Sequence, residues 1–306
     1  MKPETIALTG ATGFIGRHVL ASLRQRGYRV RILLRQPLAD SPEADSAVIG
    51  DLVRPLNLSK ALEGIDVVVH TAGLAHAMSG QPEDDYRAIN SAATIRLAET
   101  AYRMGTRRFV FLSSVRAQSG PVADAILTEQ GAATPTDAYG RSKWEAEQGL
   151  AGLGLDYAAL RPVLVYGAGV KGNMEQLLRL AHSPYWLPLG SLTARRSLLA
   201  VENLADAVAT VIGAPGRLAQ PFLVADDGAL TVGQMIGALR TGLGRRPGLL
   251  PCPPFLLTLA ARMAGQSEAF ARLSGSLVVD NAALKTLGWT PRLQTGEGLA
   301  QLARAP

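Results

Sequence analysis

Thr9-Gly10-Ala11-Thr12-Gly13-Phe14-Ile15-Gly16 stands between an apolar run at 6–8 and a segment at 14–25 whose apolar residues recur with helical spacing. We therefore expect a strand, a tight turn and a helix in direct succession. Glycines at 10, 13 and 16 let the backbone bend sharply and let the helix pack closely on the strand. N–H groups at such a helix start bind phosphate. The stretch is thus a candidate dinucleotide site, although its G-x-x-G-x-x-G spacing departs from the commoner G-x-G-x-x-G and a purely structural glycine turn is the alternative.

Strand and helix patterns alternate along the first half of the chain, which predicts a parallel sheet with helical crossovers. We expect a Rossmann-type, doubly wound α/β fold with a smaller C-terminal substrate-binding lobe. The dinucleotide-binding domain should span 1–165 and the lobe mainly 166–306, with segments near 195–225 returning to the first domain. The predicted strands lie at 6–8, 30–34, 47–49, 66–70, 108–113, 157–161 and 221–225, and the predicted helices at 14–25, 55–62, 83–104, 139–153, 174–181, 201–212 and 231–239.

The composition is that of a well-cored globular protein, with 47% hydrophobic and 18% charged residues among 306. A single cysteine, Cys252, excludes an internal disulfide. We expect a cytoplasmic protein without membrane insertion, because the start leaves no room for a signal peptide and no apolar stretch is long enough to span a bilayer. The net charge of +6 suits an anionic partner, but no lysine-rich run indicates nucleic acid, so a small phosphorylated ligand suffices.

The end of the second predicted strand bears on the choice of cofactor. An acidic residue there accepts the ribose 2′-hydroxyl of NAD, whereas an arginine accommodates the 2′-phosphate of NADP. This strand ends Leu33-Leu34-Arg35, without a carboxylate. We therefore favour NADP(H), with NAD(H) possible; a solvated surface arginine is the alternative for Arg35. Asp51 and Leu52 follow the third strand, where Asp51 is a candidate contact for the adenine or an ordinary loop residue.

A tyrosine and a lysine one helical turn apart suggest acid–base chemistry. Tyr139 and Lys143 are i and i+4, which places their Cβ atoms about 5 to 6 Å apart. We expect the lysine ammonium to lower the phenol pKa from its ordinary value near 10, and the pair then suits proton exchange with an alcohol or ketone. Ser113 and Ser114, at the end of the strand at 108–113, could hold the substrate oxygen. A solvated Tyr–Lys pair is the alternative.

Taken together, these motifs resemble the extended short-chain dehydrogenase/reductases, the NAD-dependent epimerase/dehydratase family, in its sugar-nucleotide 4-epimerase and 4-keto-reductase branch. The resemblance implies hydride transfer between a nicotinamide and a carbinol carbon. Tyr139 would be the acid or base, Lys143 would also hold the nicotinamide ribose, and Ser114 would orient the substrate oxygen, with Ser113 as the alternative because the loop at 115–120 is one residue longer than usual. The residues that would hold the cofactor are Gly10, Thr12, Gly13, Phe14, Ile15, Gly16, Arg35, Asp51, Leu52, Thr71, Ala72, Gly73, Asn90, Tyr139 and Lys143.

The second half resembles enzymes of nucleotide-diphosphate sugars. Asn173, in Gly172-Asn173-Met174, is similar to an asparagine near the substrate diphosphate, and Arg196 is similar to the arginine that binds it. The resemblance also implies a possible homodimer through the helices at 83–104 and 139–153. No set of histidines has the spacing of a metal site. His76 and Met78 lie on a loop expected to face the substrate.

Three functions remain open from the sequence. The first is reduction of a 4-keto sugar nucleotide, such as a UDP-2-acetamido-2,6-dideoxy-4-hexulose, in surface polysaccharide synthesis. The second is a UDP-hexose 4-epimerase with retained NAD; epimerases of this family carry a lysine where this chain has Ala75, which favours the reductase. The third is a non-catalytic dinucleotide-binding protein, although such relatives often lose the tyrosine or lysine that this chain keeps.

Overall fold

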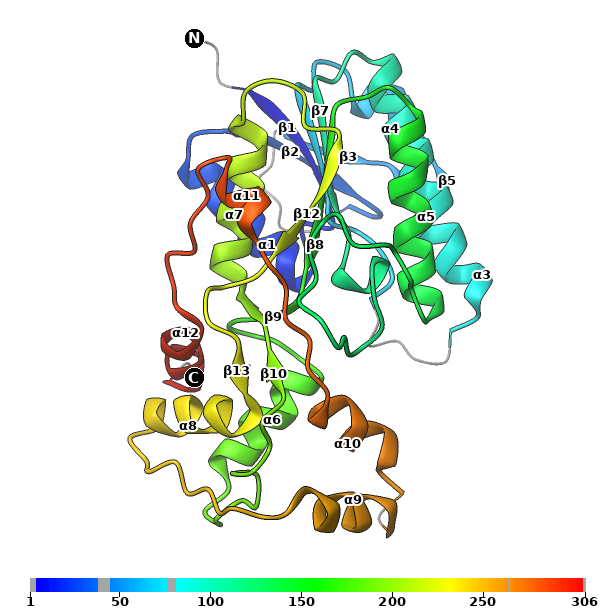
Figure 1. The fold of residues 1–306 in the computed structure, drawn as a ribbon. Coiled ribbons are helices and arrows are strands. Elements are labelled where there is room, and N and C mark those ends of the chain that lie inside the picture. The colour runs from blue at the N-terminus through cyan, green and yellow to red at the C-terminus, as the bar shows by residue number, and fades with distance from the viewer. Residues whose placement is uncertain (1–3, 38–44, 76–80, 264, 305–306) are drawn as a thin grey trace.

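A single parallel sheet of seven strands forms the centre of the protein. The computed structural model describes residues 4–37, 45–75, 81–263 and 265–304. The strand order is β12-β8-β7-β6-β1-β2-β3 (Figure 1). From β1 the chain adds strands first on one side and then, from β6 onward, on the other, as in a Rossmann fold. The predicted fold class is therefore confirmed. The strands are β1 (Thr5–Thr9), β2 (Arg29–Leu34), β3 (Ser46–Val48), β6 (Val67–His70), β7 (Arg108–Leu112), β8 (Tyr157–Pro162) and β12 (Gln220–Val224).

Helices cover both faces of this sheet. Alternate residues of β1 point to opposite faces, so Ile6 and Leu8 join one buried cluster and Ala7 the other. The first cluster packs under α1 (Phe14–Gln25) and α7 (Val201–Gly213), and the second under α2 (Leu58–Ala61), α4 (Ala93–Arg103) and α5 (Ala138–Gly152). A sheet buried on both faces explains why its strands read as continuous apolar runs.

Two predicted helices differ from the structure. The one expected at 83–104 consists of α3 (Glu83–Tyr86), the π-helical segment η1 (Arg87–Ala92) and α4. The one expected at 55–62 is shorter and consists of α2 alone. Its expected first residue belongs to β5 (Arg54–Pro55), which pairs with β4 (Gly50–Asp51), and Asn57 has a left-handed backbone, with φ of 51°, so the helix begins after it.

A second, smaller core lies at the carboxyl ends of the strands. Its buried residues include Tyr166, Met174, Leu198, Ile236 and Leu299. The chain returns from it to the main sheet through α7 and β12, while the boundary at 165/166 stays a prediction. The elements here and in the C-terminal part are β9 (Leu164–Tyr166), α6 (Asn173–His182), β10 (Arg195–Arg196), β11 (Leu198–Ala200), β13 (Leu230–Thr231), α8 (Val232–Gly242), α9 (Pro254–Met263), α10 (Ser267–Ser274), α11 (Ala282–Lys285) and α12 (Thr295–Arg304).

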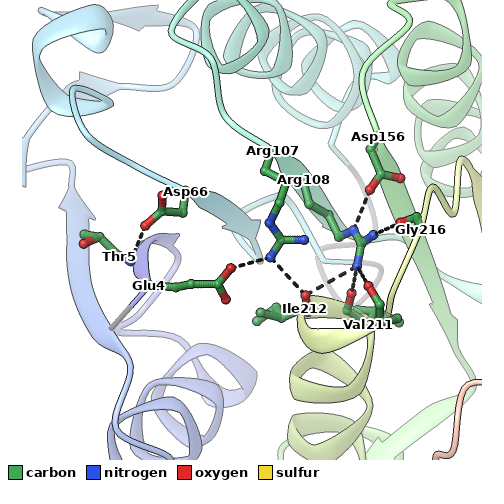
Figure 2. Close-up of polar contacts among 10 residues, drawn as sticks. Glu4, Thr5, Asp66, Arg107, Arg108, Asp156, Val211, Ile212 and Gly216 are labelled. Atoms are coloured by element: carbon green, nitrogen blue, oxygen red, sulfur yellow. Dashed lines mark hydrogen bonds and ion pairs between the residues drawn. The ribbon is translucent and has the colours of Figure 1, made fainter. Parts of the chain in front are cut away.

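Two arginines at the start of β7 fix the end of α7 to the sheet (Figure 2). Arg108 is fully buried and donates to the carbonyl oxygens of Val211 and Gly216, while its Nε pairs with Asp156 at 2.7 Å. Its neighbour Arg107 donates to Glu4 and to the carbonyl of Ile212. Cations at a helix C-terminus satisfy its unpaired carbonyl groups and oppose its dipole. In the described part of the chain, no helix combines the length and the apolar character needed to cross a membrane.

Candidate active site

The glycine-rich turn connects β1 to α1 as predicted, and the structure explains two of its glycines. Gly10 has φ of +73°, and a Cβ there would lie 2.7 Å from the amide nitrogen of Ala72 and from Oγ1 of Thr71. At Gly16 a Cβ would collide with the carbonyl oxygen of Gly10. Both positions therefore require glycine so that β1, α1 and the end of β6 can meet closely.

The start of α1 fits an anionic ligand. Gly13 is the N-cap residue and, having no side chain, provides no capping hydrogen bond, and the first turn holds no acidic residue. The first N–H groups of a helix have no partner within it, and the helix dipole favours a negative charge there. Thr12 and Gly13 are exposed, and Phe14 and Ile15 are half-buried. These residues thus suit the diphosphate of a dinucleotide.

The end of β6 is brought next to this turn. Thr71 donates from Oγ1 to the carbonyl of Thr9, and the amide of Ala72 donates to Oγ1 of Thr9. A Cβ on Gly73 would lie 2.7 Å from Oδ1 of Asn90 and 3.4 Å from Nζ of Lys143. The predicted residues from β6, η1 and α5 therefore lie together at the carboxyl ends of the central strands.

The side chain of Asn90 forms hydrogen bonds with two other segments of the protein. Its side chain accepts from the amide of Leu74 and donates to the carbonyl of Leu74 and to Oγ of Ser142. It is fully buried within the π-helical segment, a feature often found at functional sites. Asn90 thus joins the loop after β6 to α5, and direct contact with a cofactor stays a prediction.

The two serines after β7 have distinct surroundings. Ser113 donates a short hydrogen bond from Oγ to the carboxylate of Glu147. Ser114 accepts from the amide of Arg116 and forms a side-chain hydrogen bond with Tyr139. The geometry favours Ser114 over Ser113 as the partner of the phenol.

The expected acidity of Tyr139 is not found. Its pKa is raised to about 12, because burial of the phenol outweighs the hydrogen bond with Ser114 and the charge of Arg116, which both lower it. The lysine that was expected to lower this pKa is itself shifted: burial lowers the pKa of Lys143 to about 8. Lys143 donates to the carbonyl of Leu112 at 2.8 Å, and its Nζ lies 4.6 Å from the ring centre of Phe111.

A buried ion pair behind these residues was not anticipated. Arg161 donates to both oxygens of Glu147 and, through Nη1, to Oε1 of Gln118. Glu147 lies one turn beyond Lys143 on α5 and raises the pKa of that lysine, against the larger effect of burial. A glutamate in a helix and an arginine in a strand give no local signal that they pair.

The residues predicted to contact the adenosine lie at the ends of β2 and β4. Arg35 is exposed directly after β2, and Leu52 is half-buried against the core. Asp51 is exposed and accepts from the amide of Val53 at 2.8 Å, so one of its oxygens is used in its own turn. Their contacts with a cofactor stay predictions.

The predicted substrate residues belong to the smaller lobe. Asn173 is exposed at the start of α6. Arg196 donates to the carbonyl oxygens of Gly275 and Pro121, at 2.8 Å each, so it also joins β10 to two loops. His76 and Met78 lie outside the described residues. Within the described ranges, no three His, Cys, Asp or Glu side chains gather as a metal site would require.

Comparison with known proteins gives the family. The family model described as "NAD dependent epimerase/dehydratase family" matches residues 6–224. The chain belongs to this family. The match spans the glycine-rich turn, the serines after β7 and the Tyr139–Lys143 turn, so the resemblance to the extended short-chain dehydrogenase/reductases is confirmed.

Relatives in this family carry several activities. A UDP-glucose 4-epimerase of Vibrio cholerae is 35% identical to this chain, and the alignment covers 99% of this chain and 95% of the epimerase. A ceramide reductase of Caulobacter vibrioides is 30% identical, and the alignment covers 84% of this chain and 76% of the reductase. The solved structure of MoeE5 with UDP-glucuronic acid and NAD is 28% identical, covers 98% and 97%, and superposes with a TM-score of 0.76.

Proposed function

We propose that this enzyme transfers hydride at C4 of a nucleotide-diphosphate sugar and that its net reaction is reduction of a 4-keto sugar, such as UDP-2-acetamido-2,6-dideoxy-4-hexulose. The observation that carries the proposal is the hydrogen bond between Tyr139 and Ser114, which places the phenol beside the end of β7, within one helical turn of Lys143. The nicotinamide, when bound, supplies the hydride.

The protein groups have complementary roles in this proposal. With a pKa raised to about 12, Tyr139 carries its proton at neutral pH and can donate it to the C4 oxygen as the ketone is reduced. Ser114 holds that oxygen, and Lys143 positions the ribose of the cofactor. The turn from Gly10 to Gly16 holds the diphosphate of the cofactor at the start of α1.

NADP(H) is the favoured cofactor, with NAD(H) possible. Arg35 is exposed directly after β2 and has no carboxylate beside it in the sequence, which suits a 2′-phosphate. The MoeE5 structure contains NAD, which supports NAD(H) as the other possible cofactor.

A UDP-hexose 4-epimerase is the second candidate. It is favoured by the Vibrio cholerae relative, which is similar over nearly its whole length. Two residues argue against it: Ala75, where the epimerases that this chain resembles carry a lysine, and Leu34, which replaces the ribose-binding carboxylate. Both features weaken retention of NAD, which an epimerase needs between its two half-reactions.

One experiment separates the two. The purified protein is denatured and its supernatant is analysed for nucleotide; it is then assayed with NADPH or NADH and a UDP-4-keto sugar. A reductase leaves the column without stoichiometric nucleotide and consumes the added cofactor. Stoichiometric NAD, together with interconversion of UDP-glucose and UDP-galactose without added cofactor, would establish the epimerase instead. Size-exclusion chromatography with light scattering tests the proposed homodimer in the same preparation.

A further inference from the structure

Arg116 has buried hydrogen-bond donors without partners. Its Nε and Nη1 are buried and have no hydrogen-bond partner. Among the described residues, no other buried side-chain nitrogen or oxygen atom lacks one. Its third nitrogen, Nη2, forms an ion pair with Asp137. An unsatisfied buried donor has lost its hydrogen bonds to water without replacement, so native proteins rarely keep one without a reason.

The position of Arg116 is fixed next to the proposed proton donor. It lies in the short helix η2 (Val115–Ala117), two residues after Ser114. Its carbonyl oxygen packs so closely on Gly140 that a Cβ there would collide with it. Because Gly140 directly follows Tyr139, this contact holds the backbone of the loop against the start of α5. The charge of Arg116 lowers the pKa of Tyr139.

The local charge favours an anion. The charge of Arg116 also lowers the pKa of Arg196, so the two guanidinium groups lie within electrostatic reach. Arg196 donates to the neutral carbonyl oxygens of Gly275 and Pro121. One carboxylate oxygen of Asp137 pairs with Arg116. The other accepts from the amide of Gly140 and so caps the start of α5. A second guanidinium group within electrostatic reach adds to the attraction of Arg116 for an anion.

We propose that Arg116 binds an oxyanion of the substrate through Nε and Nη1, with Arg196 within electrostatic reach. This deepens the proposed function and rests on it. For the 6-deoxy sugar named above, the oxyanion is an oxygen of the diphosphate; for a uronic acid substrate, it is the sugar carboxylate. Both offer the charged acceptors that a guanidinium prefers.

The test is calorimetric titration of UDP, UDP-glucose and UDP-glucuronic acid into the intact protein with bound cofactor. We expect Arg116→Met to weaken binding at least about 10-fold, or about 1.4 kcal/mol. Equal weakening for all three ligands identifies the diphosphate as the source, and weakening confined to UDP-glucuronic acid identifies a sugar carboxylate. Arg141→Gln, which removes an exposed ion pair with Glu83, is the matched control and should bind all three normally.

A structural role for the Arg116–Asp137 pair is tested separately. Asp137→Asn keeps an N-cap acceptor but removes the competing charge. We expect it to preserve or tighten binding, whereas a purely structural pair would make it as damaging as Arg116→Met. Unchanged binding in Arg116→Met, or equal loss in both variants, would overturn the proposal. If the wild type binds none of the ligands, the proposed function fails with it.

Discussion

Lys143 donates a hydrogen bond to the main-chain carbonyl of Leu112, 2.8 Å away, and so ties α5 to the last residue of β7. The two proposed catalytic elements are thereby joined directly: the serines follow β7, and Tyr139 lies one turn before Lys143. Lys143 thus has a structural role in positioning α5, in addition to the role toward the cofactor ribose that we propose for it.

The phenol of Tyr139 is the group on which turnover depends in our proposal. Tyr139→Phe removes the proton donor, and we expect kcat to fall by about 10²- to 10⁴-fold, the usual contribution of a general acid. Dinucleotide binding, measured by fluorescence titration with NADPH, should survive. Tyr102→Phe, at an exposed tyrosine of α4, is the control. Normal turnover in Tyr139→Phe would refute the assignment.

The neighbouring serines should separate catalysis from stability. Ser114→Ala should lower kcat by about 10²-fold, the scale of losing one preorganised donor to a reacting oxygen. Ser113→Ala should leave kcat near the wild-type value and instead lower the free energy of unfolding by about 1 to 3 kcal/mol, because Glu147 loses a buried donor. Steady-state assays and urea unfolding on both variants check this, and the reverse pattern would exchange the roles of the serines.

Burial of Lys143 should make stability depend on pH above neutrality. Its pKa in the folded state is about 8, against 10.5 ordinarily, so between these values the unfolded chain binds more protons. The free energy of unfolding should then rise with pH through this window by up to about 3 kcal/mol, and this rise should be absent in Lys143→Met. Urea unfolding between pH 7.5 and 10.5 measures it, with exposed Lys60→Met as control. Equal slopes in wild type and Lys143→Met would contradict the assignment.

Local patterns predicted the glycine-rich turn and the helix that follows it. The helix expected at 14–25 is α1, with the same limits, because glycine spacing and apolar periodicity are both local properties. The helix expected at 83–104 was right in position but not in form: its π-helical segment holds Asn90, whose partners Leu74 and Ser142 are distant in sequence.

Long-range burial was the part that sequence could not provide. The sequence shows only the lysine one turn from Tyr139, whereas in the fold desolvation of the phenol dominates its pKa. The pairing of Glu147 with Arg161 and the unpartnered nitrogens of Arg116 likewise depend on contacts between separate elements, which no periodicity records.

Arg35 should distinguish the two dinucleotides. Its guanidinium is expected to pair with the 2′-phosphate, which NADH lacks, so Arg35→Ala should weaken NADPH by about 10-fold or more and leave NADH nearly unchanged. Binding titrations of both cofactors on wild type and variant check this. Equal loss for NADPH and NADH would reject the 2′-phosphate role.

Removing one partner of the buried Glu147–Arg161 pair should lower the free energy of unfolding more than replacing both partners with apolar side chains. Both side chains are almost completely buried, at 4% and 6% exposure, so Glu147→Gln leaves an arginine charge without its partner. We expect a loss of about 3 to 5 kcal/mol in the free energy of unfolding. The double variant Glu147→Met/Arg161→Met removes both charges and should recover part of this loss. Apolar side chains can fill the site, but Ser113 and Gln118 lose their partners. Urea unfolding of the single and double variants measures both effects. A single variant within about 1 kcal/mol of wild type would show that the pair contributes little and that Arg161 is neutralised by other groups.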